Sequence, residues 1–272
     1  MLLSVIIPTC NRNDLLSKCL DLLQPEVQKV PSENYEIIVT DDGNENQALS
    51  LIKEKYFQVK WIEGKKKGPA SNRNNGVNHS IGDWIVFIDD DCLPDITLLS
   101  EYVKAISNYN TFMVFEGSIY ADRPKQRMDE ESPINETGGY LWSCNFMIKK
   151  DFFNSIGQFN ESFPYAAMED IELKERILDH TQIKFLPTAT VVHPWRIVTN
   201  PAVKFKKALE SHKVYFQIRP EAKKNFQFVN LLNQFISLVK NALIDTFKYH
   251  GKGILYPINY ILFIFKLIFL KK

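Results

Sequence analysis

An α/β fold, with a mixed and mainly parallel sheet flanked by helices, is what this sequence predicts. Strand-like and helix-like patterns alternate along the first hundred residues, and repeated strand-helix-strand units imply right-handed crossovers between parallel strands. The chain has 272 residues and is 45% hydrophobic, which is enough for one large domain, or two small ones, with a real core. A disordered chain is thereby excluded.

Apolar runs and helix-like segments locate the elements in order. Four apolar runs predict strands over residues 2–8, 35–40, 59–62 and 83–88, and the first and the last of them are expected to be buried. Helix-like segments begin near Asn13 or Asp14, span 47–56, and span 70–82 with an end at Gly82. Four strands joined by three helices therefore fill about the first third of the chain.

Charge divides the chain near residue 196. Residues 1–195 carry 19 Lys and Arg against 29 Asp and Glu, whereas residues 196–272 carry 14 against 3. An acidic body suits metal-assisted chemistry, and a basic tail suits an anionic surface such as a membrane leaflet, in preference to nucleic acid.

Cysteine usage and the start of the chain indicate a compartment. The four cysteines lack CxxC spacing, which argues against a zinc site or a disulfide framework and favours a reducing environment. The apolar start is short and lacks a basic region, so no signal peptide is expected.

The stretch IVFIDDDCLPD, residues 85–95, runs an apolar strand into three consecutive aspartates. Like charges repel and burial penalises each carboxylate, so Asp89, Asp90 and Asp91 predict a cationic ligand. Side chains alternate along an extended segment, so Asp89 and Asp91 are expected to share one side while Asp90 points elsewhere. Such oxygen ligands suit Mg²⁺ or Mn²⁺. A solvated turn, reinforced by Pro94, is the alternative.

Polar residues follow three of the four predicted strands. Ligands of such sheets bind beyond the carboxyl ends of the strands. Three clusters are therefore expected to share one crevice: Pro8, Thr9 and Asn11, then Asp41, Asp42 and Gly43, then Asp89 to Asp91. The sequence has neither a GxGxxG fingerprint nor a GxxxxGKS/T loop, so a cation that bridges carboxylate to phosphate is the expected way to hold a diphosphate.

Seven segments together carry a resemblance to a known family. They are SVIIPTCNR, IIVTDDG, GPASNRNNG, FIDDDCLPD, GGYLWSCNFMIKKDFFNSIGQFNESF, MEDIEL and VVHPW. In order and spacing the chain resembles glycosyltransferase family 2 over about residues 1–196. The resemblance implies the Rossmann-like GT-A fold, an inverting reaction, a nucleotide-sugar donor, a divalent cation and a hydroxyl acceptor. It also implies a catalytic domain over 1–196, with a nucleotide-sugar-binding half (1–95) and an acceptor-binding half (96–196).

The resemblance assigns a nucleotide and metal group position by position. Pro8, Thr9, Asp41, Asp42, Arg73, Asp89 and Asp90 are implied for the nucleotide sugar, and Asp91, Asp89 and His193 for Mn²⁺ or Mg²⁺. Asp42 is expected to accept the imide N–H of uracil, and Arg73 to contact phosphate or base. A helix cap or turn is the alternative for Asp41 and Asp42, and a surface cation for Arg73. An ordinary hydrogen-bonded histidine is equally open for His193.

The acceptor side is implied by the same resemblance. Its residues are Gly139, Trp142, Asn145, Glu169 and Asp170. Gly139 permits close backbone approach to a sugar, Asn145 offers hydrogen bonds, and Trp142 fits stacking or the core equally well. Asp170 is expected to be the general base for the acceptor hydroxyl, and Glu169 to bind donor or acceptor hydroxyls. Carboxylates are also favoured at helix N-termini without any catalytic task, which is the alternative for both.

Beyond residue 196 the resemblance ends. Residues 226–247 have an amphipathic repeat, and residues 254–272 form an apolar stretch that contains Pro257 and Lys266. This stretch is just short of the length of a spanning helix, so an interfacial or re-entrant helix is expected. Anionic lipid would explain the basic balance of the tail. A hydrophobic helix packed on the catalytic domain or on a second subunit is the alternative.

Two functions of different classes follow. The first is a glycosyltransferase, peripheral on the cytoplasmic, inner face of the cell membrane, that builds a cell-surface polysaccharide. It would move a sugar from a UDP-sugar to a glycan or a lipid-linked saccharide. The second is a noncatalytic sugar-nucleotide-binding or scaffold subunit recruited to the membrane. Retention of both the aspartate run and the Glu169–Asp170 pair favours the enzyme. A nucleotidyltransferase is disfavoured, because the chain lacks a glycine-rich, basic opening motif. Nucleic acid is not expected as a partner, and a homo-oligomer is left open.

Overall fold

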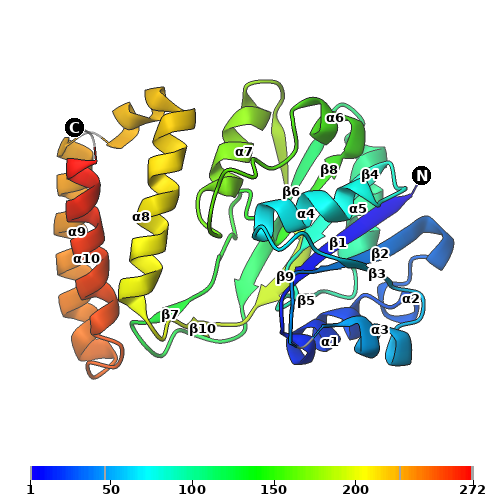
Figure 1. Ribbon diagram of the computed structural model, residues 1–272, viewed down its shortest axis with the longest axis horizontal. Helices are drawn as coiled ribbons and strands as arrows, with labels where there is room; N and C mark the ends of the chain where they lie inside the picture. The colour runs from blue at the N-terminus through cyan, green and yellow to red at the C-terminus, as the bar shows by residue number, and fades with distance from the viewer. Residues whose placement is uncertain (1, 46, 227, 271–272) are drawn as a thin grey trace. The chain divides into compact units, whose positions relative to one another are not determined.

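The chain folds into two compact units. The computed structural model describes residues 2–45, 47–226 and 228–270, and within these the side chains of 225–232, 268 and 269 lie outside the description, including part of the 226–247 repeat. A sheet unit comprises Met1–Asp122, Pro133–Glu161 and Glu169–Pro194 (Figure 1). A helical unit comprises Arg123–Ser132, Ser162–Met168 and Trp195–Lys272. Two segments from before residue 196 thus belong to the C-terminal unit, which the expected division at 196 did not include.

The sheet unit is built on one mixed sheet with the strand order β3-β2-β1-β4-β8-β6-β9-β5. The strands are β1 (Leu3–Thr9), β2 (Tyr35–Asp41), β3 (Lys60–Glu63), β4 (Trp84–Ile88), β5 (Leu93–Pro94), β6 (Val114–Ala121), β8 (Asn145–Lys149) and β9 (Ile183–His193). β8 runs antiparallel to β4 and β6, and β5 runs antiparallel to β9. The other pairings are parallel, which confirms a mixed, mainly parallel sheet.

Helices cover both faces of this sheet. They are α1 (Asn13–Leu22), α2 (Pro25–Gln28), α3 (Leu49–Lys55), α4 (Pro69–Asn78), α5 (Leu98–Asn108), α6 (Lys150–Ser155) and α7 (Glu169–Leu178), with a 3-10 turn, η1, at Ser32–Asn34. In β1, Val5 and Ile7 pack with α1, α3 and α5, whereas Ile6 packs with α4, α6 and α7. Alternate side chains of a central strand thus enter two separate cores.

The third helix ends earlier than the sequence predicts. α4 stops at Asn78 rather than at Gly82. The Ser80 hydroxyl and the Ser80 N–H both donate to the carbonyl oxygen of Val77, which satisfies the last turn of the helix. Gly82 instead meets β1, where its N–H donates to the hydroxyl of Ser4.

The helical unit holds the expected C-terminal helices. A short pair of strands, β7 (Glu130–Glu131) and β10 (Arg196–Ile197), precedes α8 (Pro201–Ile218), the 3-10 helix η2 (Pro220–Phe226), α9 (Phe228–Lys248) and α10 (Leu255–Phe269). In the described ranges, 2–45, 47–226 and 228–270, none of the helices combines the length and the hydrophobicity that crossing a membrane requires.

α10 packs on α8 through aromatic side chains. The ring centroid of Phe205 lies 5.3, 5.1 and 5.4 Å from those of Tyr256, Tyr260 and Phe263. Ring pairs at this separation add to the burial of the rings themselves. One side of the apolar stretch is therefore core of the helical unit, and the other side is exposed, because Phe265 is 53% accessible.

Two phenylalanines on α10 provide a matched stability test. Phe263 is buried and Phe265 is exposed. Phe263→Ala is expected to lower the free energy of unfolding by about 3 kcal/mol, whereas Phe265→Ala changes it by less than about 0.5 kcal/mol. Urea unfolding followed by far-UV circular dichroism measures both. Equal effects would mean that α10 does not pack on α8 through this face.

Candidate active site

The carboxyl ends of β1 and β4 meet through their side chains. The Thr9 hydroxyl, at the end of β1, donates to Asp90 Oδ2 over 2.6 Å. Pro8, one residue earlier, is buried within β1. The two strands lie side by side and parallel, so the sheet places the first and last of the predicted clusters at one edge.

The three aspartates lie in a turn and take different partners. Asp89 accepts from Arg73 over 2.7 Å, Asp90 accepts from Thr9, and Asp91 Oδ1 lies 3.3 Å from His193 Nε2. The expected alternation, with Asp89 and Asp91 on one side, is wrong. The N–H of Cys92 donates to the carbonyl of Asp89 and closes a turn, so strand geometry ends at β4.

Arg12 is a functional candidate that the sequence analysis missed. Its guanidinium makes two bonds to Asp90, Nε to Oδ2 at 3.0 Å and Nη2 to Oδ1 at 2.6 Å, and its Nη1 lies 3.3 Å from Asp91. Burial raises the pKa of Asp90 to about 7, against the opposing effect of Arg12. Its position in the sequence could have indicated this role, because Arg12 follows β1 at the edge of the sheet where the aspartates also lie.

Arg73 joins the aspartate turn to the start of α7. It is buried on α4, so the alternative of a surface cation is wrong. Its Nη2 bonds to Asp89, and its Nη1 lies 3.7 Å from Glu169 Oε1. Its guanidinium carbon also stands 5.6 Å from the ring centroid of Phe159. A buried guanidinium between two carboxylates is held in a fixed orientation.

Glu169 and Asp170 are both buried at the N-terminus of α7. Burial raises the pKa of each carboxyl, and for Glu169 the charge of Asp170 is the next cause. Asp170 Oδ1 accepts the N–H of Ile171. Glu169 Oε2 is buried, and it has no hydrogen-bond partner in the described part of the chain. A helix-dipole role does not need such burial, and a buried, unpartnered carboxylate oxygen is able to accept a hydrogen bond from a ligand.

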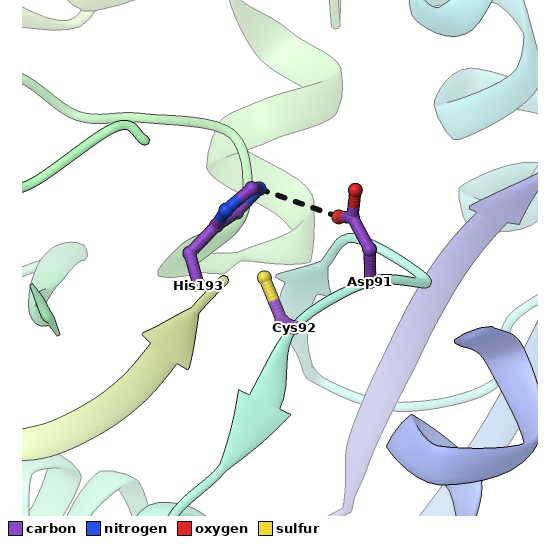
Figure 2. A group of neighbouring side chains, drawn as sticks. All are labelled: Asp91, Cys92 and His193. Atoms are coloured by element: carbon purple, nitrogen blue, oxygen red, sulfur yellow. Dashed lines mark ion pairs between the residues drawn. The ribbon is translucent and has the colours of Figure 1, made fainter. Parts of the chain in front are cut away.

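Asp91 and His193 could hold a divalent cation. Figure 2 shows both side chains pointing toward one another, from the turn after β4 and from the end of β9, with Cys92 beside them. His193 Nδ1 lies 2.9 Å from the carbonyl oxygen of Pro194. If Nδ1 carries the proton and donates there, the lone pair of Nε2 faces Asp91.

The chemistry of these donors decides which cation fits. A hydrogen bond with Cys144 and burial raise the pKa of the Cys92 thiol well above its usual range, and sulfur is a soft ligand that hard cations do not favour. A carboxylate and an imidazole remain as donors. They fit a cation such as Mn²⁺ that completes its coordination with phosphate oxygens and water.

The second strand end supplies one structural and one accessible carboxylate. Asp41 is fully buried and accepts the N–H groups of Gly43 and Ala48 and the indole N–H of Trp61. These bonds occupy both oxygens, so Asp41 holds the loop before α3 and does not face a ligand. Asp42 is half-buried and accepts the N–H of Lys66.

Asn72 is a further residue that sequence reasoning missed. It is buried on α4, and its amide donates to the carbonyl oxygens of Thr40, over 2.9 Å, and Thr9, over 3.4 Å. It therefore ties α4 to the ends of β1 and β2. In the sequence Asn72 is one of several asparagines near the start of a predicted helix, and this pattern does not indicate which residues its side chain contacts.

On the acceptor side, Gly139 and Trp142 are available and Asn145 is not. An added Cβ at Gly139 would meet no atom within 4 Å, so its surroundings are open. Trp142 is half-buried against the core and stacks with exposed Tyr140 at a centroid distance of 5.7 Å. Asn145 is fully buried and bonds Ser118, Ala189 and Tyr102. It therefore braces β6 and β9, and its expected role in sugar binding is corrected to packing.

Glu116 shapes the loop that contains Gly139. Its buried carboxylate accepts the backbone N–H groups of Gly139, Tyr140 and Leu141. Lys174 of α7 donates to the carbonyl of Gly139, so the loop lies beside the helix that carries Asp170. Glu116 precedes this loop by more than twenty residues in the sequence, and no motif pointed to it.

This combination of fold and site is the one expected for a GT-A glycosyltransferase. The family described as Glycosyl transferase family 2 matches residues 4–166, more than half of the chain, and the chain belongs to that family.

Relatives and solved structures agree with this assignment. The chain is 34% identical over 141 residues, 49% of its length, to poly(ribitol-phosphate) beta-glucosyltransferase of Bacillus spizizenii. It is 29% identical over 189 residues, 64% of its length, to GalNAc(5)-diNAcBac-PP-undecaprenol beta-1,3-glucosyltransferase of Campylobacter jejuni. The matches cover 22% and 55% of these relatives, so the chain spans about a fifth and about half of their lengths.

The crystal structure of S. aureus TarS 1-349 superposes with a TM-score of 0.59 at 17% identity, over 98% of this chain and 90% of that one. The same protein in complex with UDP-GlcNAc superposes with a TM-score of 0.58 at 17% identity, over 98% and 91%. At this identity the likeness shows the fold.

Proposed function

We propose that the protein is an inverting glycosyltransferase that moves a sugar from a UDP-sugar to a hydroxyl of a glycan or lipid-linked saccharide, in cell-surface polysaccharide synthesis. One observation carries the proposal. Arg73 stands between Asp89 of the aspartate turn and Glu169 at the start of α7. The donor residues and the candidate base therefore belong to one buried cluster. The names of the two relatives, a poly(ribitol-phosphate) beta-glucosyltransferase and a beta-1,3-glucosyltransferase of a PP-undecaprenol-linked saccharide, support the substrate class.

In this mechanism Asp170 takes the proton of the acceptor hydroxyl as its oxygen attacks the anomeric carbon. Glu169, whose Oε2 lacks a partner among the described residues, binds a hydroxyl of donor or acceptor. Arg73 is fixed by its two carboxylates, and its buried Nε has no hydrogen-bond partner in the described chain. This N–H is available to the departing diphosphate. A single displacement inverts the anomeric centre.

Asp91 and His193 are the residues that would hold Mn²⁺ or Mg²⁺, with Asp89 close by in the same turn. When bound, the cation would neutralise charge on the diphosphate. Arg12 pairs with Asp90 and Asp91, so it keeps the carboxylates of this turn in place.

The base of the nucleotide is assigned to the loop after β2. Asp42 is the accessible carboxylate there, and in this proposal it accepts the imide N–H of uracil. The carbonyl oxygen of Thr9 accepts the N–H of Asp42 and the amide of Asn72, and these bonds hold the neighbouring backbone. The UDP and UDP-GlcNAc complexes of S. aureus TarS, a protein of the same fold, support uridine as the base.

A panel of nucleotide sugars tests this function. The intact chain, with Mn²⁺ or Mg²⁺, is expected to hydrolyse at least one UDP-sugar slowly and to leave GDP- and CMP-sugars unchanged. The readout is release of the free nucleotide, which is UDP or GDP from the diphosphate sugars and CMP from a CMP-sugar. Tight UDP binding without turnover of any donor, even with added lipid-linked saccharides, would favour a noncatalytic sugar-nucleotide-binding subunit instead.

A further inference from the structure

Two rows of exposed apolar side chains run along the last two helices of the helical unit. The α9 stripe consists of Ile236, Leu243, Ile244 and Phe247, and the α10 stripe consists of Leu255, Ile258, Leu262 and Phe265. These eight side chains are between 46% and 82% exposed. Members of each stripe recur mostly at three- and four-residue spacing, so each stripe lies on one face of its helix.

The two stripes belong to one packed pair of helices. α9 and α10 lie side by side and pack against each other, as Figure 1 shows, and α10 also packs on α8 through Phe263. The buried side of α10 is thus already occupied, and the stripe is a second, outward face. Exposed apolar surface of this extent on a soluble unit marks an interaction site.

Lysines are placed within and beside the stripes. Lys240 lies four residues after Ile236 and three before Leu243, and Lys266 lies four residues after Leu262. Lys248 and Lys252 stand at the turn between the helices. Asp245 is the one acidic residue in the sequence from 228 to 270. A lysine in an apolar face can lay its aliphatic stem along acyl chains and send its ammonium group to phosphate.

We infer that the two stripes form an in-plane docking surface for an anionic lipid leaflet. In the described residues, 228–270 included, no helix is long and apolar enough to cross a membrane. Each stripe runs along one exposed face of its helix, and an in-plane orientation turns both stripes toward the acyl chains. Anionic headgroups then match the lysines. A two-fold contact with a second copy fits less well, because it would set lysine-bearing stripes that contain no carboxylate against each other. The inference stands independently of the proposed function.

The first test uses the full chain and large vesicles of phosphatidylglycerol and phosphatidylcholine. The protein is expected to co-sediment with these vesicles at about 0.1 M salt and to bind less at about 0.5 M, since the lipid charge is screened over a shorter distance. Pure phosphatidylcholine vesicles are expected to bind it weakly. Failure to bind the anionic vesicles at low salt would overturn the inference.

The second test separates the stripes from exposed apolar residues in general. The stripe variant Leu243→Ser/Phe247→Ser/Leu262→Ser/Phe265→Ser is expected to lose vesicle affinity by roughly tenfold or more. Its matched control changes Phe57 and Ile81 to serine. These residues are 90% and 73% exposed on the sheet unit, and this control should bind as the wild type does. Equal losses in both variants would contradict a surface confined to α9 and α10.

A third variant, Lys240→Gln/Lys248→Gln/Lys266→Gln, tests the charge component. It is expected to weaken binding to anionic vesicles and to leave the weak binding to phosphatidylcholine unchanged. Far-UV circular dichroism of each variant reports whether the helices persist. If size-exclusion chromatography shows a wild-type dimer that the stripe variant abolishes, while vesicle binding is unchanged, the face docks a second copy and the lipid inference is wrong.

Discussion

Replacing Asp170 with asparagine is expected to lower kcat by roughly 10²- to 10⁴-fold, because the amide keeps the size of the side chain and cannot accept the acceptor proton. Donor binding should survive, since Arg73 and the aspartate turn are unchanged. Steady-state kinetics and UDP titration measure the two effects. Asp14→Asn is the matched control: it changes another aspartate in the first turn of a helix, α1, where the side chain is exposed.

The pH profile gives a second reading of the same residue. Burial raises the pKa of Asp170, and the base acts in its charged form. Activity should therefore fall with decreasing pH at a higher value than the ordinary aspartate pKa of about 4. The variant should lack this acidic limb. If the affinity for UDP collapses together with kcat, Asp170 is a binding residue rather than the base. Separately, an axial product from an axial donor would contradict an inverting reaction.

Asp91→Asn is expected to remove the cation dependence of UDP binding and to reduce turnover by roughly 10³-fold or more, since a bound cation supplies several kcal/mol of charge stabilisation. The amide lacks the negative charge that a hard cation requires. Calorimetric titration of UDP with and without Mn²⁺ measures the first effect. Unchanged activity in excess EDTA would contradict the assignment of a metal site to Asp91.

Cys92→Ala is the control for that experiment. Cys92 neighbours Asp91 and His193, but its thiol donates to the carbonyl of Cys144, and sulfur is a soft ligand. Its loss should leave the affinity for Mn²⁺ unchanged. A loss equal to that of Asp91→Asn would show that the sulfur is a ligand and would point to a softer metal.

Periodicity was enough to predict the first four strands in the sequence, β1 to β4, because most of them are short, continuous apolar runs. Local rules were least reliable where the chain turns. The sequence analysis treated the three aspartates as a continuation of the extended strand β4. In the structure the N–H of Cys92 donates to the carbonyl of Asp89, and this turn ends the strand. Alternation along a strand says nothing about a turn.

The site residues that were missed act through partners distant in sequence. Arg12 reaches Asp90, and Glu116 holds the N–H groups of the loop at Gly139. Neither pairing leaves a local pattern. The prediction for Asn145 was wrong for the opposite reason. Its place in a segment that resembles the family suggested that it binds a sugar, whereas its amide joins β6 and β9. In both cases the partners of the side chain in the folded chain decide its role, and the sequence does not state them.

The path of the chain between the two units bears on how the protein is made. The chain passes from one unit to the other five times, and the segment 123–132 finds its partners late in the sequence. Glu131 is bound by Lys204 and Tyr256, and the N–H of Met128 donates to the carbonyl of Lys252. During synthesis the sheet can form as an early unit. The hydrogen bond between Tyr256 and Glu131 can form only after Tyr256 has left the ribosome. A chain that ended near residue 196 would leave the carboxylate of Glu131 without Lys204 and Tyr256. The C-terminal helices are therefore needed to complete the packing of the segment 123–132.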